Sequence, residues 1–391
     1  MEFQNKSNIK WVIVFMSFCQ GLQFSVSPVL QKIQITYPEV SRELVQMLIT
    51  APAIMATIIA VLSGVVVSIV GKKKLVLLGT LICAVSGLIP FFIGDFGVLF
   101  GSRIVLGIGL GIVTVLNTAV VAEHFHGRDR INVMGLQGAS IGGGMLLISF
   151  MSGILGEVTF EYAYLVHVLA LIAFLVVIFL LPDKGREEIE SNKSIRLNKK
   201  AYVIAVLTFV EFIFLISFST NIAMHISGKY LGDSAVAGII IGVFSAIQIL
   251  CGLFLGYISK WTKQYTLYIA MLCFSFGAFT LVLFSDNYAF LIVGALLCGA
   301  SQGIFIPRAM YEISNAVDIK ATALAAAAIT VMINIGQLIS PIILNYLSLY
   351  ILGEKTTTNV FIIGMVVMFL LPMFLIIRKK GVIRDGILNR N

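Results

Sequence analysis

The chain has 391 residues, of which 59% are hydrophobic and 12% are charged, and its formal net charge is +8. A soluble domain carries about 25% charged residues, so this composition excludes an ordinary water-exposed globular protein. The mean hydropathy of +1.02 indicates an integral membrane protein, and the basic excess lies in the gaps between apolar segments, which argues against a nucleic-acid partner.

Twelve apolar segments are long enough to cross a bilayer as helices, since a crossing takes about 20 residues. In chain order they span 11–31, 44–70, 75–94, 98–122, 132–155, 162–182, 201–226, 235–258, 266–285, 288–312, 320–350 and 358–377. The sequence therefore predicts an all-α membrane protein with twelve transmembrane helices. The first segment is longer than the apolar part of a cleavable signal and lacks a small-residue cleavage site, so we expect it to be retained.

The basic residues predict the orientation of these helices. All but five of the 27 Lys and Arg residues fall in alternate gaps and in the terminal segments. The exceptions are Lys32, Arg42, Arg103, Lys229 and Lys355. Because cytoplasmic loops carry the excess of Lys and Arg, we expect both termini in the cytoplasm of a multi-pass protein of the plasma membrane, the inner membrane of a bacterium.

A polar stretch divides the apolar segments into two groups of six. Residues 183–200 carry ten charges and few large apolar side chains. The predicted organisation is an N-terminal six-helix bundle over 1–182, a cytoplasmic linker over 183–200, and a C-terminal six-helix bundle with a short cytoplasmic tail over 201–391.

Glycines suggest that the two groups are related by duplication. Three pairs are each separated by 192 positions: Gly64 and Gly256, Gly107 and Gly299, and Gly111 and Gly303. Two parallel six-helix repeats around a cavity at the bilayer midplane are an established plan for transporters. We therefore expect two pseudo-repeats around a central cavity.

The loop between the second and third segments resembles the signature loop of the major facilitator superfamily. That loop runs Gly, three residues, Asp, Arg, one residue, Gly and two basic residues, and here Gly64, Gly71, Lys72 and Lys73 match it. Residues 68–69, Ser-Ile, stand where the acid and the first base belong. The resemblance implies a gating role for the four matching residues.

Two further motifs resemble the same family. Arg103, Gly107 and Gly109 are similar to its fourth-helix motif, with Leu106 in place of the usual Gln. The run 138–143, Gly-Ala-Ser-Ile-Gly-Gly, resembles the Gly-Pro-x-x-Gly-Gly element of the twelve-helix drug:proton antiporters, with Ala replacing Pro. The resemblance implies the major facilitator fold and a multidrug-efflux type of antiporter, expected to function as a monomer.

Glu211 is the candidate proton carrier. It lies about ten residues into the seventh segment, near the bilayer midplane. An ionised carboxylate at that depth costs about 2.5–3.5 kcal/mol on insertion scales, and intramembrane acids commonly mark proton or substrate paths. Such a group could load a proton from one side and release it to the other. The alternative is a protonated Glu hydrogen-bonded within the bundle, with no role in transport.

Arg103 is a second candidate for proton coupling, in the fourth segment. The cation could attract an anionic substrate, or interact with Glu211 across the two halves and tune its protonation. Alternatively, Arg103 snorkels to the outer headgroups, which its shallow depth permits.

Uncharged polar side chains recur on the helix faces expected to line the cavity. The candidates are Gln20, Gln23, Asn117, Gln137, Thr208, Asn221, Asn334 and Gln337. Amides facing a cavity would suit a substrate of mixed polarity. They could equally form interhelical hydrogen bonds, worth about 0.6 kcal/mol each in membranes.

The sequence thus predicts a proton-coupled transporter that works by alternating access and exports small organic or amphipathic compounds. Its expected partners are a small-molecule substrate, protons and the lipid bilayer, and neither a cofactor nor a metal is expected. Uptake of a small anionic or polar nutrient is the first alternative. A lipid-modifying membrane enzyme is a remote one, because residues 123–126, Glu-His-Phe-His, lack the spacing of a helical zinc site and are expected in a solvated loop. A receptor of transporter fold is a third alternative.

Overall fold

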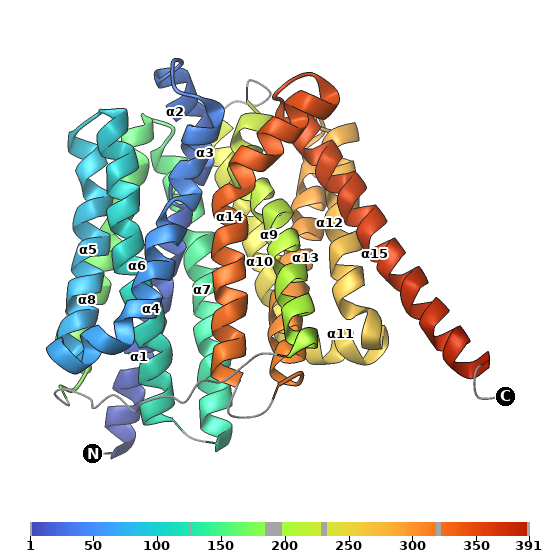
Figure 1. The fold of residues 1–391 in the computed structure, drawn as a ribbon. Helices are drawn as coiled ribbons and strands as arrows, with labels where there is room; N and C mark the ends of the chain where they lie inside the picture. The colour runs from blue at the N-terminus through green and yellow to red at the C-terminus, as the bar shows by residue number, and fades with distance from the viewer. Residues whose placement is uncertain (1, 126, 184–197, 228–232, 318–321, 389–391) are drawn as a thin grey trace.

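The computed structural model describes residues 2–125, 127–183, 198–227, 233–317 and 322–388, and these residues are all-helical (Figure 1). The helices before residue 183 are α1 (Glu2–Gln20), η1 (Gly21–Phe24), η2 (Ser27–Val29), α2 (Leu30–Thr36), α3 (Arg42–Thr50), α4 (Pro52–Val70), α5 (Lys72–Phe92), α6 (Phe96–His124), α7 (Gly127–Leu155), η3 (Phe160–His167) and α8 (Val168–Leu180). Those after it are α9 (Lys199–His225), α10 (Asp233–Leu253), α11 (Leu255–Thr262), η4 (Lys263–Tyr265), α12 (Thr266–Leu283), α13 (Tyr288–Ser314), α14 (Thr322–Leu352) and α15 (Thr357–Leu388).

Twelve stretches of the described residues are long and apolar enough to cross a membrane. This confirms the predicted all-α fold with twelve transmembrane helices. The first crossing is longer than the expected 11–31, since it extends over Lys6–Thr36. Most of the expected linker, residues 184–197, lies outside the described residues.

Polar side chains fix where several helices begin. The side chain of Asp95 accepts a hydrogen bond from the Val98 amide at the start of α6, and Asn198 does the same for the Ala201 amide at the start of α9. Such N-caps satisfy amides that have no partner within the helix. The cap at Asn198 thus fixes the start of the helix whose middle carries Glu211.

Proline interrupts the first two crossings. Pro28 is the second residue of η2 in the first crossing, and Pro52 begins α4 after the single residue that separates it from α3. Proline has no amide N–H, so it leaves a carbonyl one turn earlier without its helical partner. These breaks therefore create buried backbone oxygens that need hydrogen-bond donors from outside their own helix.

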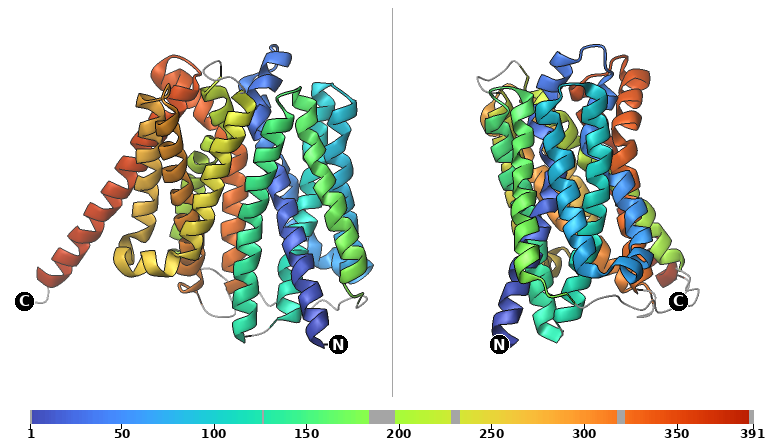
Figure 2. Two further views of the ribbon diagram at one scale, coloured as in Figure 1. Left: turned by 180° about the vertical axis from the view of Figure 1, so that it is seen from behind. Right: turned by 90° about the vertical axis from the view of Figure 1, so that its left-hand side faces the viewer.

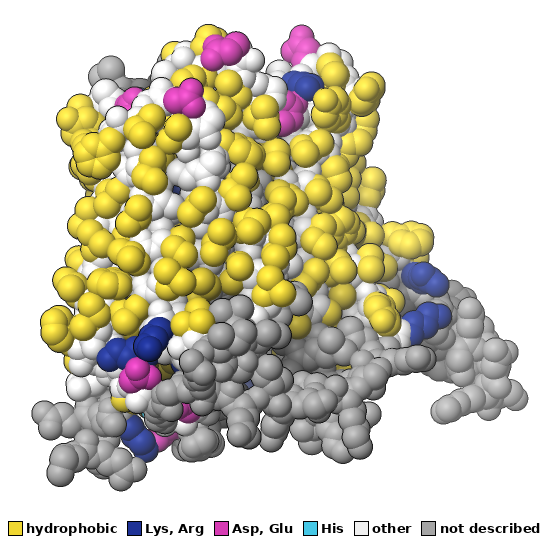
Figure 3. Space-filling model, turned by 60° about the vertical axis from the view of Figure 1, so that its left-hand side comes forward, with side chains coloured by type: hydrophobic (Ala, Val, Ile, Leu, Met, Phe, Trp, Pro, Cys, Tyr) yellow, Lys and Arg dark blue, Asp and Glu magenta, His cyan; other side chains and the backbone are white. Residues whose placement is uncertain are grey.

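The helices form two side-by-side groups, α1–α8 and α9–α15 (Figures 1 and 2). The start of α1 and the end of α15 lie at the same end of the bundle, which we call the termini face; the other end is the opposite face. Hydrophobic side chains cover the middle of the molecule's side, and charged side chains gather toward its two ends (Figure 3). This is the surface of a protein that sits in a bilayer.

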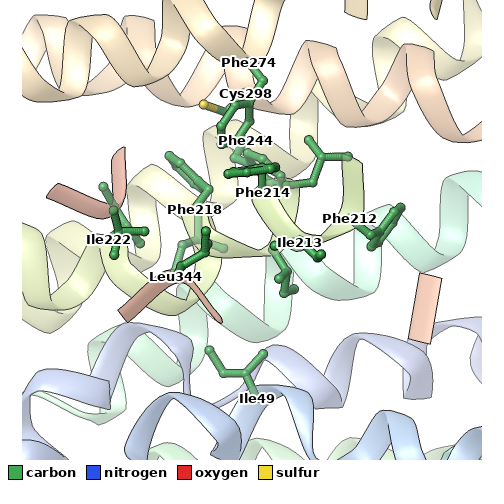
Figure 4. Close-up of a cluster of buried hydrophobic side chains, with 14 of the residues drawn as sticks. Ile49, Phe212, Ile213, Phe214, Phe218, Ile222, Phe244, Phe274, Cys298 and Leu344 are labelled. Carbon is green, nitrogen blue, oxygen red and sulfur yellow. The ribbon is translucent and has the colours of Figure 1, made fainter. Parts of the chain in front are cut away.

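Two hydrophobic cores hold the bundle together. One consists only of residues from the first group, between Ile9 and Leu181. The other is built around α9 and contains the ring stack of Phe218 and Phe244, 4.6 Å between centroids (Figure 4). This second core also includes Ile49 and its neighbours on α2 and α3, so the two groups share one core toward the opposite face.

Equivalent glycines bring equivalent helices together in the two groups. A Cβ on Gly107 would lie 2.3 Å from the carbonyl oxygen of Pro52, and one on Gly299 would lie 2.2 Å from that of Phe244. Phe244 is 192 positions after Pro52, as Gly299 is after Gly107. Gly111 against Ala56 and Gly303 against Gln248 repeat the relation. The offset predicted from the glycines therefore also relates their packing partners.

Replacing Gly299 with alanine is expected to destabilise the fold by about 1–3 kcal/mol, the usual cost of overpacking a close contact. The added Cβ would force α13 away from the backbone of α10. Thermal unfolding of the purified protein in detergent measures the effect. Gly256→Ala is the matched control, because a Cβ there meets nothing within 4 Å. Equal melting temperatures for the two variants would contradict the packing argument.

Candidate functional site

Glu211 lies in the middle of α9 and is fully buried. The Ser301 hydroxyl on α13 donates a hydrogen bond of 3.3 Å to Oε1 of Glu211. The other carboxyl oxygen, Oε2, has no hydrogen-bond partner among the described residues. The side chain therefore points into the second group of helices and not toward lipid, with one oxygen free to carry a proton.

The repeat shows that this carboxyl group belongs to one half only. The positions 192 residues before Glu211 and Ser301 are Cys19 and Gly109, so the equivalent place in the first group has neither acid nor hydroxyl. Equivalent packing is therefore possible without a carboxyl group. Because burying an ionisable side chain in this way is costly, Glu211 is a candidate functional residue.

Arg103 is also fully buried, so the expected alternative that it snorkels to the headgroups is wrong. Its Nε donates a hydrogen bond of 2.7 Å to the carbonyl of Leu48, the oxygen that Pro52 leaves without a helical partner. Its other nitrogens donate to the Ser25 hydroxyl and to the carbonyl of Gln23, beside the break between α1 and α2. Arg103 thus satisfies backbone groups exposed by two helix breaks.

Four polar side chains join the two groups at mid-depth. The Gln23 amide donates to Gln337 on α14 at 3.4 Å, and Gln337 donates to Asn334 at 3.2 Å. Asn334 in turn donates to the hydroxyl of Thr57 on α4 at 2.7 Å. The structure thus brings three of the predicted cavity residues into one chain of hydrogen bonds.

A second set, which we call the interhalf amide cluster, lies nearer the opposite face and consists of Gln46, Asn221 and Asn345. Gln46 donates to Asn221 at 2.8 Å and accepts from Asn345 at 2.6 Å. All three side chains are buried. The cluster ties α3 to both α9 and α14.

An ion pair and a hydrogen bond also join the two groups at the opposite face, beyond the interhalf amide cluster. Lys355 lies 2.6 Å from the Glu43 carboxylate, and Arg42 donates to the Lys355 carbonyl at 2.8 Å. These hydrogen bonds between the two groups therefore run from mid-depth to the opposite face.

The other predicted cavity residues lie within a single group of helices. Asn117 donates to Ser17, and Gln137 donates to Thr118, so both connect helices of the first group. Thr208 donates to the Ile204 carbonyl of its own helix. The Nε2 atom of Gln20 is buried and has no hydrogen-bond partner among the described residues.

The loop that resembles the family signature is held by its second glycine and two lysines. Gly71 has a φ of +90°, a left-handed conformation that favours glycine, and it precedes α5. Lys72 forms an ion pair of 2.5 Å with Glu123, and Lys73 donates to the Ile178 carbonyl. Gly64, Ser68 and Ile69 lie in α4, in a stretch where the structure does not describe the side chains.

Residues 123–124, expected in a solvated loop, instead form the last turn of α6, and His126 lies outside the described residues. His225, at the end of α9, is buried between Thr357 and the Leu281 carbonyl, each 3.0 Å from a ring nitrogen.

A crevice of about 400 Å³ lies between the two groups on the side of the termini face. Its walls come from α7, α10 and α13, and Gly138 and Gly142 of the antiporter-like motif form part of them. Sequence reasoning found those glycines but not Gln248 or Gln302, which also line the crevice.

Together these features define a membrane protein of two helical halves joined by a polar contact zone. The sequence profile of the Major Facilitator Superfamily matches residues 13–209 and again residues 204–385. The chain belongs to this superfamily.

Two curated relatives are drug-resistance proteins. The chain is 26% identical over 255 residues to the quinolone resistance protein NorA of Staphylococcus aureus, an alignment that covers 62% of this chain and 65% of that relative. It is 22% identical over 298 residues to the class H tetracycline resistance protein of Pasteurella multocida, covering 72% and 73%.

Solved structures share the fold at low identity. The nucleoside transporter NupG (D323A mutant) matches with a TM-score of 0.74 at 14% identity, covering 93% of this chain and 99% of that one. A D-xylose-proton symporter matches with a TM-score of 0.71 at 13% identity, covering 92% and 96%.

Proposed function

We propose that the protein is a proton-coupled exporter of small, amphipathic organic compounds and works by alternating access. Both termini face the cytoplasm of a bacterium, the protein acts as a monomer, and Glu211 carries the proton. The names of the two drug-resistance relatives support export of organic compounds.

One observation carries the proposal: the Glu211 carboxyl group is enclosed at mid-depth, and its Oε2 has no hydrogen-bond partner among the residues that the structure describes. Since the charged form is costly there, the group favours a bound proton until water or substrate reaches it. Access from one side at a time then ties proton exchange to the opening of the bundle.

The arrangement of contacts supports a particular state of the cycle. Hydrogen bonds and a shared core hold the halves together toward the opposite face, whereas a crevice lies between them near the termini face. With the termini in the cytoplasm, this is an inward-facing state. Outward opening then requires the interhalf amide cluster to separate.

The uptake alternative receives less support from the site. It uses Arg103 to bind an anion, but the guanidinium already donates to three carbonyl oxygens and a hydroxyl. A bound anion would have to replace these bonds and leave buried carbonyls unpaired, which costs about 1–3 kcal/mol for each group.

The test is a flux assay in proteoliposomes loaded with a pH-sensitive dye. When a library of small organic compounds that includes quinolones, tetracyclines and neutral apolar molecules is supplied on the side of the termini face, we expect transported compounds and protons to move in opposite directions, and an imposed pH gradient to drive these compounds against their own gradient. Substrate flux that ignores the pH gradient and moves no protons would show a uniporter instead.

A further inference from the structure

The crevice near the termini face contains polar groups that the proposed mechanism does not use. Its lining includes two glutamines, Gln248 on α10 and Gln302 on α13, among glycines and aliphatic side chains. None of the lining residues that the structure describes is charged. An uncharged wall that is mostly apolar favours an uncharged ligand, because a charge moved there would lose its hydration without gaining a counter-ion.

Gln248 has a buried hydrogen-bonding atom with no partner. Its Oε1 atom lacks a partner among the described residues, although buried polar atoms are nearly always hydrogen-bonded. The oxygen can accept a hydrogen bond, so the group that would satisfy it is a donor.

The repeat shows that helix packing does not require these glutamines. Gly303 packs against Gln248 as Gly111 packs against Ala56, which lies 192 positions earlier. The residue 192 positions before Gln302 is Leu110. The first group therefore makes the equivalent contact with two apolar side chains, and the polar pair is particular to the crevice side of the second group.

We propose that the crevice is the ligand-selecting site for uncharged, mainly apolar compounds that carry one hydrogen-bond donor, and that Gln248 accepts the bond from that donor while Gln302 forms the adjacent polar wall. The inference rests on the proposed function, since it names the chemical class of the transported compound. The volume of about 400 Å³ is ample for a planar molecule of three fused rings.

A pair of neutral fluorescent probes tests the donor requirement: acridone, which has one N–H, and N-methylacridone, which has none. We measure equilibrium binding to the full-length purified protein in lipid nanodiscs by fluorescence anisotropy, with empty nanodiscs subtracted. The wild type is expected to bind acridone about five- to tenfold more tightly, the value of one hydrogen bond. Gln248→Ala, which installs the residue of the equivalent repeat position, is expected to bind both probes equally.

A second variant tests the location of the site independently of hydrogen bonding. Gly138 lines the crevice, and a Cβ added there meets nothing within 4 Å, so Gly138→Leu should fold and fill the space. It is expected to weaken binding of both probes by at least about tenfold. Gly256→Leu is the matched control, because a Cβ at Gly256 is equally unhindered and lies outside the crevice.

A donor preference that survives in Gln248→Ala, wild-type affinity in Gly138→Leu, or absence of any donor preference in the wild type would each overturn the inference. Binding is measured without a pH gradient or flux, so a failure of proton coupling leaves this result unaffected. Conversely, failure of probe binding leaves the proton-flux test intact.

Discussion

Replacing Glu211 with glutamine is expected to abolish proton-driven accumulation of substrate while leaving the protein folded. Glutamine has nearly the same shape, and its amide oxygen can still accept the hydrogen bond from Ser301. It cannot bind or release a proton in the physiological range. The variant should therefore move substrate only down its own gradient.

The size of the effect follows from the driving force. One pH unit corresponds to 1.36 kcal/mol per proton, so a one-for-one exchange supports a substrate ratio of about ten across the membrane. In proteoliposomes with a gradient of one unit, the wild type is expected to approach this ratio, and Glu211→Gln to stay near one.

Glu39→Gln is the matched control for this experiment, since Glu39 is an exposed carboxylate. It should accumulate substrate as the wild type does. If Glu211→Gln reached the wild-type ratio, Glu211 would have no part in coupling, and its burial beside Ser301 would be purely structural.

The second large effect is expected from Gln46→Leu. Gln46 connects Asn221 to Asn345 by one hydrogen bond to each, and all three side chains are buried. Leucine would leave two buried amides without those partners, each at a cost of about 1–3 kcal/mol. This penalty applies only to the state in which the halves are closed at the opposite face. The variant should therefore raise the ratio of the open to the closed state at that face by a factor of about ten or more.

Spin labels at Glu39→Cys and Asp286→Cys, in a background without the five native cysteines, would measure the separation of the halves by double electron–electron resonance. Both positions are exposed near the opposite face, and one belongs to each group of helices. We expect Gln46→Leu to increase the population with the longer distance.

Gln34→Leu is the matched control, because the Gln34 amide donates to the Val40 carbonyl within the first group. It should leave the distance distribution unchanged. Coincident distributions for Gln46→Leu and the wild type would mean that the interhalf amide cluster does not hold this face closed.

The fold could be predicted from hydropathy because a bilayer requires one long apolar stretch for each crossing. Glycines also revealed the repeat, since close backbone contacts between Gly107 and Pro52 and between Gly299 and Phe244 leave no room for a side chain. Glu211 could be singled out as a candidate because a lone acid in an apolar segment is unusual. These signals are all local in the sequence.

The partners of the polar residues could not be predicted in the same way. Helical spacing placed Gln23, Asn334 and Gln337 on defined faces, but not the neighbour that each face meets. Gln46 and Thr57 were missed because each is a single polar residue within an apolar stretch.

The bonds of Arg103 depend on two chain breaks that come together only in the folded bundle. One signal was present in the sequence: Pro52 implies a carbonyl at Leu48 that needs another donor. Which side chain supplies that donor is decided by tertiary packing, where Arg103 of α6 reaches Leu48 of α3.

Proton release on substrate binding is the most direct test of the proposed role of Glu211. Substrate is added to the purified protein in weakly buffered detergent solution with a pH indicator, and the protons released are counted for the wild type and for Glu211→Gln. The account predicts release from the wild type and none from the variant. Equal release from both proteins would contradict it.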